Sequence, residues 1–275
     1  MVETVLERER VPEARDGREV VLSVRDVTVA FGDNVVLDHL SLDVYRGEIL
    51  GFVGASGTGK SVLLRTVLGL TPKRSGTVSL FGADIDRVSE QHRFEIDTRL
   101  GVLFQHGALF SALTVKENIQ VPMREYLDLP QALMDELAML KLELVGLRPD
   151  AAGKFPSQLS GGMIKRAALA RALALDPDIV FLDEPTSGLD PIGAAEFDEL
   201  VAKLRDTMGL TVYMVTHDLD SLFSVCDRIA VLGNKKVLVE GTLDKMMHFD
   251  DPWVKSYFRG KRARQIDLSA REQAG

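Results

Sequence analysis

The residues best suited to bind a phosphate chain lie at positions 54–61, in the order Gly-Ala-Ser-Gly-Thr-Gly-Lys-Ser. Glycines let the backbone turn tightly, so that successive N–H groups can point inward at an anion. Lys60 can reach the outer phosphates of a nucleotide, and the Ser61 hydroxyl is a ligand for Mg²⁺. The segment follows an apolar run at 49–53 and precedes a predicted helix, which is the order that a phosphate-binding loop requires. We therefore predict a nucleotide site here.

Two adjacent carboxylates, Asp183 and Glu184, follow four apolar residues at 179–182. The run is typical of a buried strand whose carboxyl end opens at a ligand crevice. Because adjacent side chains of a strand diverge, Asp183 can hold Mg²⁺ while Glu184 faces an attacking water. A carboxylate that orients and polarises water suits phosphoryl transfer. Without the phosphate loop, the same pair would suit a solvated acidic turn before Pro185.

A second candidate anion site lies at residues 159–163, Leu-Ser-Gly-Gly-Met, which precede a helix rich in Ala, Leu and Arg. A serine and two glycines at a helix start expose backbone N–H groups to an anion. If each chain binds one nucleotide but has two anion sites, the second site can bind the γ-phosphate of the nucleotide held by another copy of the chain. This segment therefore predicts a head-to-tail dimer.

With these motifs in this order, residues 20–245 resemble the ATPase subunit of an ABC transporter. Phe31 resembles the aromatic residue that stacks on adenine, and Gln105 the glutamine that senses Mg²⁺ and couples to the membrane subunits. Residues 187–190 resemble the loop that meets the opposing subunit, and His217 the histidine that contacts the γ-phosphate. Met163 departs from the pattern, because the general family signature has glutamine there.

The resemblance implies ATP and Mg²⁺ as cofactors and three sets of site residues. The catalytic residues would be Glu184, His217 and Gln105. The Mg²⁺ ligands would be Ser61, Gln105 and Asp183. The ATP-binding residues would be Phe31, Gly54, Ser56, Gly57, Thr58, Gly59, Lys60, Ser61, Ser160, Gly161, Gly162 and Asp190.

Three segments together resemble the ATPases of Mla/Mce-type phospholipid transporters: residues 105–110, 121–125 and the Met163 form of the signature. The resemblance implies a homodimer beneath a multispanning permease, with a lipid-binding Mce-type protein and a small regulatory subunit as further partners. It also implies a place on the cytoplasmic face of the inner membrane.

The elements that must position these residues alternate between strand and helix patterns. Apolar runs at 49–53, 179–182 and 211–215 predict buried parallel strands, and helices are predicted at 61–70, 162–175, 194–208 and from Leu219. Short β-rich runs between Val20 and Tyr45 surround a turn at Gly32-Asp33-Asn34, and residues 111–156 read as helical. The expected fold is α/β: an ABC-type P-loop core with a parallel sheet, an antiparallel β subdomain and a helical subdomain.

We expect a mobile tail at 1–18, an ABC ATPase domain at 19–245 with its helical subdomain at about 106–172, and a C-terminal extension at 246–275. The net charge of −8 argues against nucleic acid as a partner. The single cysteine, Cys226, excludes an internal disulfide and reads as a small buried apolar residue. No stretch has the ~20 consecutive apolar residues of a membrane span.

A soluble ABC ATPase of cofactor assembly, and a transporter subunit for another substrate, remain open alternatives. A DNA-repair ATPase is disfavoured because no coiled coil separates Gly54 from Ser160, and a translation factor because the chain has one ATPase domain. Glu184 and His217 disfavour a scaffold that binds nucleotide without hydrolysing it.

For two segments, the sequence does not distinguish contact with a partner protein from packing within the chain's own domain. Leu109, Phe110 and Leu113 could contact the membrane subunits or pack within the helical subdomain. Residues 253–264 contain the only tryptophan and end in basic residues, which is typical of protein contacts. They could hold the dimer or a small partner, or form a short helix packed on their own domain.

Overall fold

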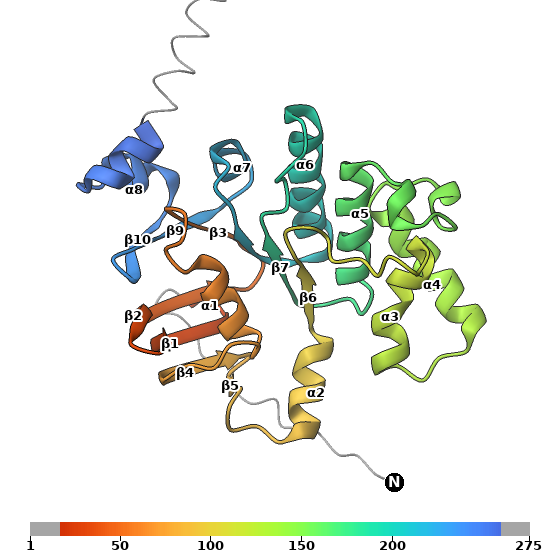
Figure 1. Ribbon diagram of the computed structural model, residues 1–275, viewed down its shortest axis with the longest axis horizontal. Coiled ribbons are helices and arrows are strands. Elements are labelled where there is room, and N and C mark those ends of the chain that lie inside the picture. Colours follow the sequence, from red (N-terminus) through yellow and green to blue (C-terminus); the bar gives the residue numbers. More distant parts are fainter. Residues whose placement is uncertain (1–16, 260–275) are drawn as a thin grey trace, which may run out of the picture.

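A six-stranded sheet forms the centre of the computed structural model, which describes residues 17–259 (Figure 1). The strand order is β10-β9-β3-β8-β7-β6, and β10 pairs antiparallel with β9 while all other neighbours are parallel. Its strands are β3 (Ile49–Gly54), β6 (Leu100–Leu103), β7 (Ile179–Asp183), β8 (Thr211–Val215), β9 (Arg228–Gly233) and β10 (Lys236–Gly241). Every residue of β3, β7 and β8 is buried, which explains their unbroken apolar runs.

A second, antiparallel sheet has the order β2-β1-β4-β5. It consists of β1 (Val20–Phe31), β2 (Asn34–Tyr45), β4 (Ser75–Leu80) and β5 (Ala83–Asp84). β1 and β2 are longer than the short runs that the sequence predicts, because both strands continue to the turn at Gly32-Asp33. The predicted antiparallel sheet and the ABC-type α/β fold are confirmed.

Helices flank the central sheet and complete the remaining layers. They are α1 (Lys60–Val67), α2 (Glu90–Thr98), α6 (Pro191–Met208), α7 (Leu219–Ser224) and α8 (Leu243–His248). α6 begins three residues before its predicted start, because the Asp190 side chain accepts hydrogen bonds from two backbone N–H groups of the first turn and Pro191 suits that turn. None of the helices in residues 17–259 is long and apolar enough to cross a bilayer.

A group of helices lies at the opposite end of the molecule from the antiparallel sheet and α8 (Figure 1). It contains α3 (Val115–Tyr126), α4 (Gln131–Leu144), two short 3₁₀ turns (Pro149–Ala151 and Pro156–Gln158) and α5 (Gly161–Ala172). α5 packs against the edge strand β6, and the buried side chains of the group belong to one core with those of β7 and α6. Leu109 packs on this core, whereas Phe110 is exposed.

The chain after β10 packs on its own subunit as far as the structure describes it. Met246 of α8 and Val254 and Phe258 of a final helical segment, residues 252–259, are fully buried. They share a core with α7, β9 and Val53 of β3. This supports internal packing for Val254 and Phe258, while Trp253 and Tyr257 are partly buried. Residues 260–264 of the predicted contact segment lie outside the described residues.

Cys226 lies between α7 and β9, in close contact with Gly51 of β3. A Cβ atom on Gly51 would be 2.9 Å from the Cys226 sulfur and 2.5 Å from Leu222, so any other residue would displace these side chains. Burial raises the pKa of the Cys226 thiol. Cys226 packs against two apolar cores but is only partly buried, so it is a small apolar packing residue as predicted without being fully buried.

Candidate functional site

The predicted phosphate loop connects the carboxyl end of β3 to the start of α1. Gly57 and Gly59 have φ values of 76° and 110°, in the region that favours glycine. At Gly59 a Cβ atom would also be 2.8 Å from Val36, and at Gly54 it would be 2.5 Å from the Leu232 carbonyl. The glycines therefore allow a tight turn beside β2 and β9, with the free N–H groups of α1 at its end.

Lys60 lies over this loop. Its ammonium donates hydrogen bonds to the carbonyls of Gly54, at 2.8 Å, and Ala55, at 3.1 Å. Burial lowers the pKa of Lys60, against the opposing effect of the carboxylates of Glu184 and Asp183. A cation held on the loop by carbonyl oxygens can exchange those contacts for phosphate oxygens, which suits a nucleotide polyphosphate.

Ser61 and Asp183 meet at the base of the loop, with 3.5 Å between the hydroxyl and a carboxylate oxygen. Burial, and then the charge of Glu184, raise the pKa of Asp183. A hydroxyl and a carboxylate are the hard oxygen ligands that Mg²⁺ prefers. Within residues 17–259 no group of three His, Cys, Asp or Glu could hold a metal ion. The Ser61 hydroxyl and the Asp183 carboxylate fit a Mg²⁺ ion that would take its remaining ligands from phosphates and water.

Glu184 sits at the end of β7 in a strained backbone conformation, with a φ of 51°. Its N–H donates to the Val215 carbonyl at 2.8 Å, which connects it to the end of β8. Its carboxylate, 14% exposed, lies 2.6 Å from Nδ1 of His217. The two predicted catalytic residues are thus brought together beside the phosphate loop, although they come from different strand ends.

Lys165 of α5 is a site residue that the sequence reasoning missed. It is 5% exposed, and its ammonium donates to the backbone carbonyls of Gln105 and, at 3.0 Å, Glu184. Burial lowers the pKa of Lys165, against the charges of Glu184 and Asp183. The available signal was a lysine within the predicted apolar helix, because a buried lysine requires polar partners.

Three other predicted site residues, Phe31, Gln105 and Ser160, form no hydrogen bond with the Glu184–His217 pair within residues 17–259. Phe31 is 55% exposed at the end of β1, and Gln105 is exposed after β6. In the described chain, the side chain of Gln105 makes no hydrogen bond to Ser61 or Asp183. The signature residue Ser160 begins α5 and accepts a hydrogen bond from the Met163 N–H.

The signature segment does not reach the phosphate loop of its own chain. α1 follows β3, whereas α5 packs at the far edge of the sheet, beside β6. Gly161 instead lies near the loop at 187–190. A Cβ atom placed on Gly161 would be 3.8 Å from the Leu189 side chain. The carboxylate of Asp190 in that loop is occupied with capping α6.

A family model described as "ABC transporter" matches residues 37–187, which include the loop, the signature segment and both carboxylates. The chain belongs to the ABC transporter family. As an ABC ATPase, it is an ATP-binding and ATP-hydrolysing subunit.

Among named relatives, the ABC ATPase is 39% identical to the intermembrane phospholipid transport system ATP-binding protein MlaF of Haemophilus influenzae, over 88% of this chain and 91% of MlaF. It is 38% identical to the probable ribonucleotide transport ATP-binding protein mkl of Mycobacterium leprae, over 92% of this chain and 74% of mkl. The structure resembles a dimeric post-hydrolysis state of the ATP-binding cassette MJ0796 bound to ADP and Pi, with a TM-score of 0.73 and 29% identity over 80% of this chain and 98% of the cassette. It also resembles cbiO1 of Clostridium perfringens, with a TM-score of 0.76 and 26% identity over 90% of this chain and 99% of cbiO1.

Proposed function

We propose that this chain powers phospholipid transport, as a homodimer on the cytoplasmic face of the inner membrane. The observation that carries the proposal is the 39% identity to MlaF over nearly the whole of both chains. The ribonucleotide alternative is less well supported, because the chain spans only 74% of mkl. The proposed partners are a multispanning permease, a lipid-binding Mce-type protein and a small regulatory subunit.

In the proposed mechanism, the loop N–H groups and Lys60 bind the ATP phosphates, and Phe31 packs on adenine. Ser61 and Asp183, with Gln105, would hold Mg²⁺, which supplies positive charge against the phosphates. Glu184 orients and polarises the attacking water. His217 pairs with Glu184 at 2.6 Å, which supports a role for the imidazole beside the γ-phosphate.

The signature segment supports the dimer in this proposal. Ser160 and the glycines that follow it present the start of α5, but this helix packs at the sheet edge farthest from the phosphate loop of its own chain. A second copy in head-to-tail orientation would bring Ser160 and Gly162 to the nucleotide of the first. Hydrolysis would then require both subunits.

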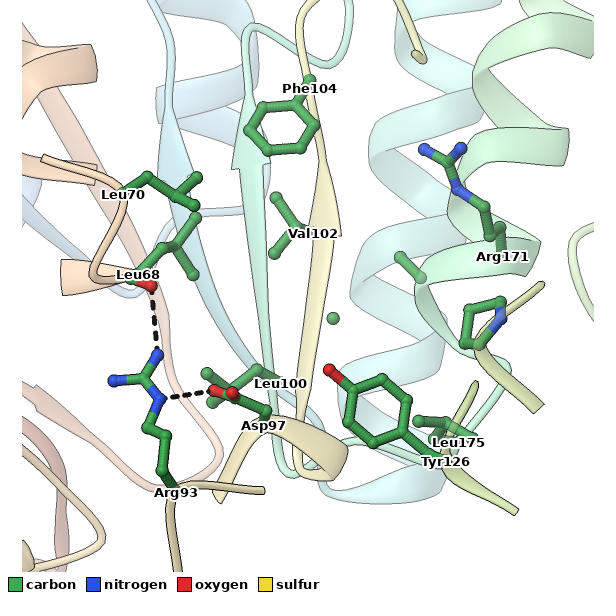
Figure 2. Close-up of a pocket in the computed structure, with 13 residues that line it drawn as sticks. Leu68, Leu70, Arg93, Asp97, Leu100, Val102, Phe104, Tyr126, Arg171 and Leu175 are labelled. Carbon is green, nitrogen blue, oxygen red and sulfur yellow. Dashed lines mark hydrogen bonds and ion pairs between the residues drawn. The ribbon is translucent and has the colours of Figure 1, made fainter. Parts of the chain in front are cut away.

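A groove between the ATPase core and the helical group is the proposed docking site for the permease (Figure 2). Its pocket has a volume of about 290 Å³. Apolar side chains and one aromatic hydroxyl face it, and Arg93 on its wall is fixed by the Leu68 carbonyl, at 3.1 Å, and by Asp97, at 2.9 Å. We assign it one occupant, a short amphipathic helix of the membrane-spanning subunit, because the family is a transporter family and the described chain has no membrane-spanning helix of its own.

The groove is connected to the catalytic centre through two of its walls. Phe104, which lines it, immediately precedes Gln105. Arg171, on the opposite wall, donates hydrogen bonds of 2.8 and 2.6 Å to the carbonyls of Gly107 and Ala108. A helix that moves in the groove would therefore shift the Gln105 segment, which supports the coupling role proposed for this glutamine.

The proposal is tested on the native complex, purified in detergent through a tag on this chain. Mass spectrometry should identify a multispanning membrane protein and enriched phospholipid. In proteoliposomes containing that complex, a fluorescent phospholipid should be transferred only with ATP, and Glu184→Gln should abolish the transfer. Purification without a membrane protein would instead favour a soluble ABC ATPase, and ATP-driven ribonucleotide uptake without lipid transfer would favour the mkl-like function.

A further inference from the structure

The C-terminal helical segment, residues 252–259, reaches the catalytic histidine of its own subunit. The Tyr257 hydroxyl donates a hydrogen bond of 2.8 Å to the backbone carbonyl of His217. His217 in turn lies 2.6 Å from Glu184. We propose that Tyr257 is a positioning residue for ATP hydrolysis, which holds His217 in place from the C-terminal segment. This inference rests on the role proposed above for His217.

His217 needs such support because little else fixes it. Its side chain is 67% exposed and pairs with the Glu184 carboxylate. The segment before it is anchored by the Thr216 N–H, which donates to the Phe52 carbonyl at 3.3 Å. The segment after it begins α7, whose first turn is capped by Asp218. The Tyr257 hydrogen bond fixes the peptide group between these two anchors.

Tyr257 itself is held firmly enough to act in this way. Trp253 stacks on its ring at a centroid distance of 4.7 Å and an angle of 14°. The carboxylate of Asp251 accepts hydrogen bonds from the N–H groups of Trp253, at 2.9 Å, and Val254, at 3.0 Å, and so caps the segment.

The same segment also packs against the helix that follows His217. Phe258 is fully buried and stacks on Phe223 of α7 at 6.4 Å, in the core shared with Val53 at the end of β3. In Figure 1, α7 and the C-terminal chain are drawn on the same side of the sheet. A displacement of residues 252–259 would therefore remove the Tyr257 hydrogen bond and the packing on α7 together.

The test compares full-length variants in steady-state ATPase assays. Tyr257→Phe removes only the hydroxyl and keeps the stacked ring, and we expect kcat to fall about three- to tenfold, as for the loss of one neutral hydrogen bond. KM for ATP should stay the same, and the thermal midpoint should fall only slightly, as expected for one lost hydrogen bond. The matched control is Tyr45→Phe, since Tyr45 packs against the guanidinium groups of Arg18 and Arg228 far from this site. Replacement of Tyr257 by 4-aminophenylalanine, which keeps a donor, should restore kcat.

A spectroscopic readout separates positioning from a general loss of structure. The chain has five histidines, so the ¹³Cε1 resonance of His217 can be assigned by its loss in His217→Ala. Tyr257→Phe should shift or broaden this resonance and leave those of His39 and His92 unchanged. A wild-type kcat and an unshifted resonance in Tyr257→Phe would overturn the inference. If His217→Ala also kept full activity, the role proposed for His217 would fail as well.

Discussion

The ammonium of Lys165 in α5 donates a hydrogen bond of 3.0 Å to the backbone carbonyl of Glu184, the residue proposed to hold the attacking water. The same ammonium also contacts the Gln105 carbonyl. One buried charge therefore connects the helix that begins with the signature serine to two residues of the nucleotide site. The carbonyl that accepts this bond belongs to a residue with a left-handed backbone, at a φ of 51°.

Lys165→Met should lower kcat by tenfold or more, since a hydrogen bond to a charged group contributes about 1.5–3 kcal/mol. ATP affinity, measured by equilibrium binding, should change much less. The matched control is Lys141→Met, because Lys141 is also buried but pairs with Asp176, away from the site. Similar losses of kcat in both variants would assign Lys165 to general stability rather than to the catalytic centre.

Binding and turnover should separate in the two central variants. Lys60→Ala removes the cation of the phosphate loop and should weaken nucleotide binding strongly. Glu184→Gln keeps the shape of the side chain and should retain binding, lose turnover and accumulate an ATP-bound dimer, seen by size-exclusion chromatography. Equal ATPase rates in Glu184→Gln and the wild type would contradict the role of Glu184.

Asp198 of α6 should make the folded state sensitive to pH. It is 4% exposed, and burial raises its pKa to about 6, although the neighbouring Ser221 hydroxyl acts in the opposite direction and the carboxylates of Asp218 and Asp220 add to the increase. Since the folded pKa exceeds the unfolded value of about 3.9, the stabilisation is complete below that value and is lost as pH rises through 6.

Asp198→Asn should therefore raise the unfolding midpoint at pH 7.5, with an upper limit of about 3 kcal/mol in the free energy of unfolding for a pKa difference of two. The gain should shrink mainly as the pH falls from about 6 to about 4, between the folded and unfolded pKa values. Glu199→Gln, on the exposed side of the same helix, serves as the control. A gain that is independent of pH would show that the carboxylate of Asp198 is not the cause.

The permease contact should depend on Phe110 more than on Leu109. Leu109 packs on the core of the helical group, so Leu109→Asp should lower the unfolding midpoint. Phe110 is 53% exposed, and Phe110→Asp should keep the isolated subunit folded with normal ATPase activity. In the reconstituted complex, the same variant should reduce lipid transfer. Normal transfer by Phe110→Asp would remove this side chain from the proposed contact.

The most regular parts of the molecule could be predicted from the sequence. The strand Thr211–Val215 has the predicted bounds, and β3 and β7 follow their apolar runs, because strands buried on both faces carry an unbroken signal. α2 and β6 were not predicted, because their hydrophobic patterns are weak. In α2 only Ile96 is buried, and β6 is a four-residue edge strand, so neither shows a clear hydrophobic period.

At the site, motif spacing predicted the phosphate loop, Ser61 and the two carboxylates, and the family resemblance added His217. The contact between Glu184 and His217 was not predicted and comes from the structure. The contacts of Lys165 and Tyr257 could not be predicted, because both go to backbone carbonyls of residues distant in the sequence. A backbone carbonyl has the same chemistry at every position, so the sequence contains no signal for such a partner.

The thiol of Cys226, wedged against Gly51 and poorly ionised, makes this chain a natural background for site-directed labelling. The thiolate is the form that attacks maleimide, so the native protein, in which the pKa of this thiol is raised, should react slowly. A single cysteine introduced at an exposed position, such as Ser256 beside Tyr257, should then react selectively without removal of the original one. A fluorophore there would report, in real time, whether the C-terminal helix moves during each ATP cycle.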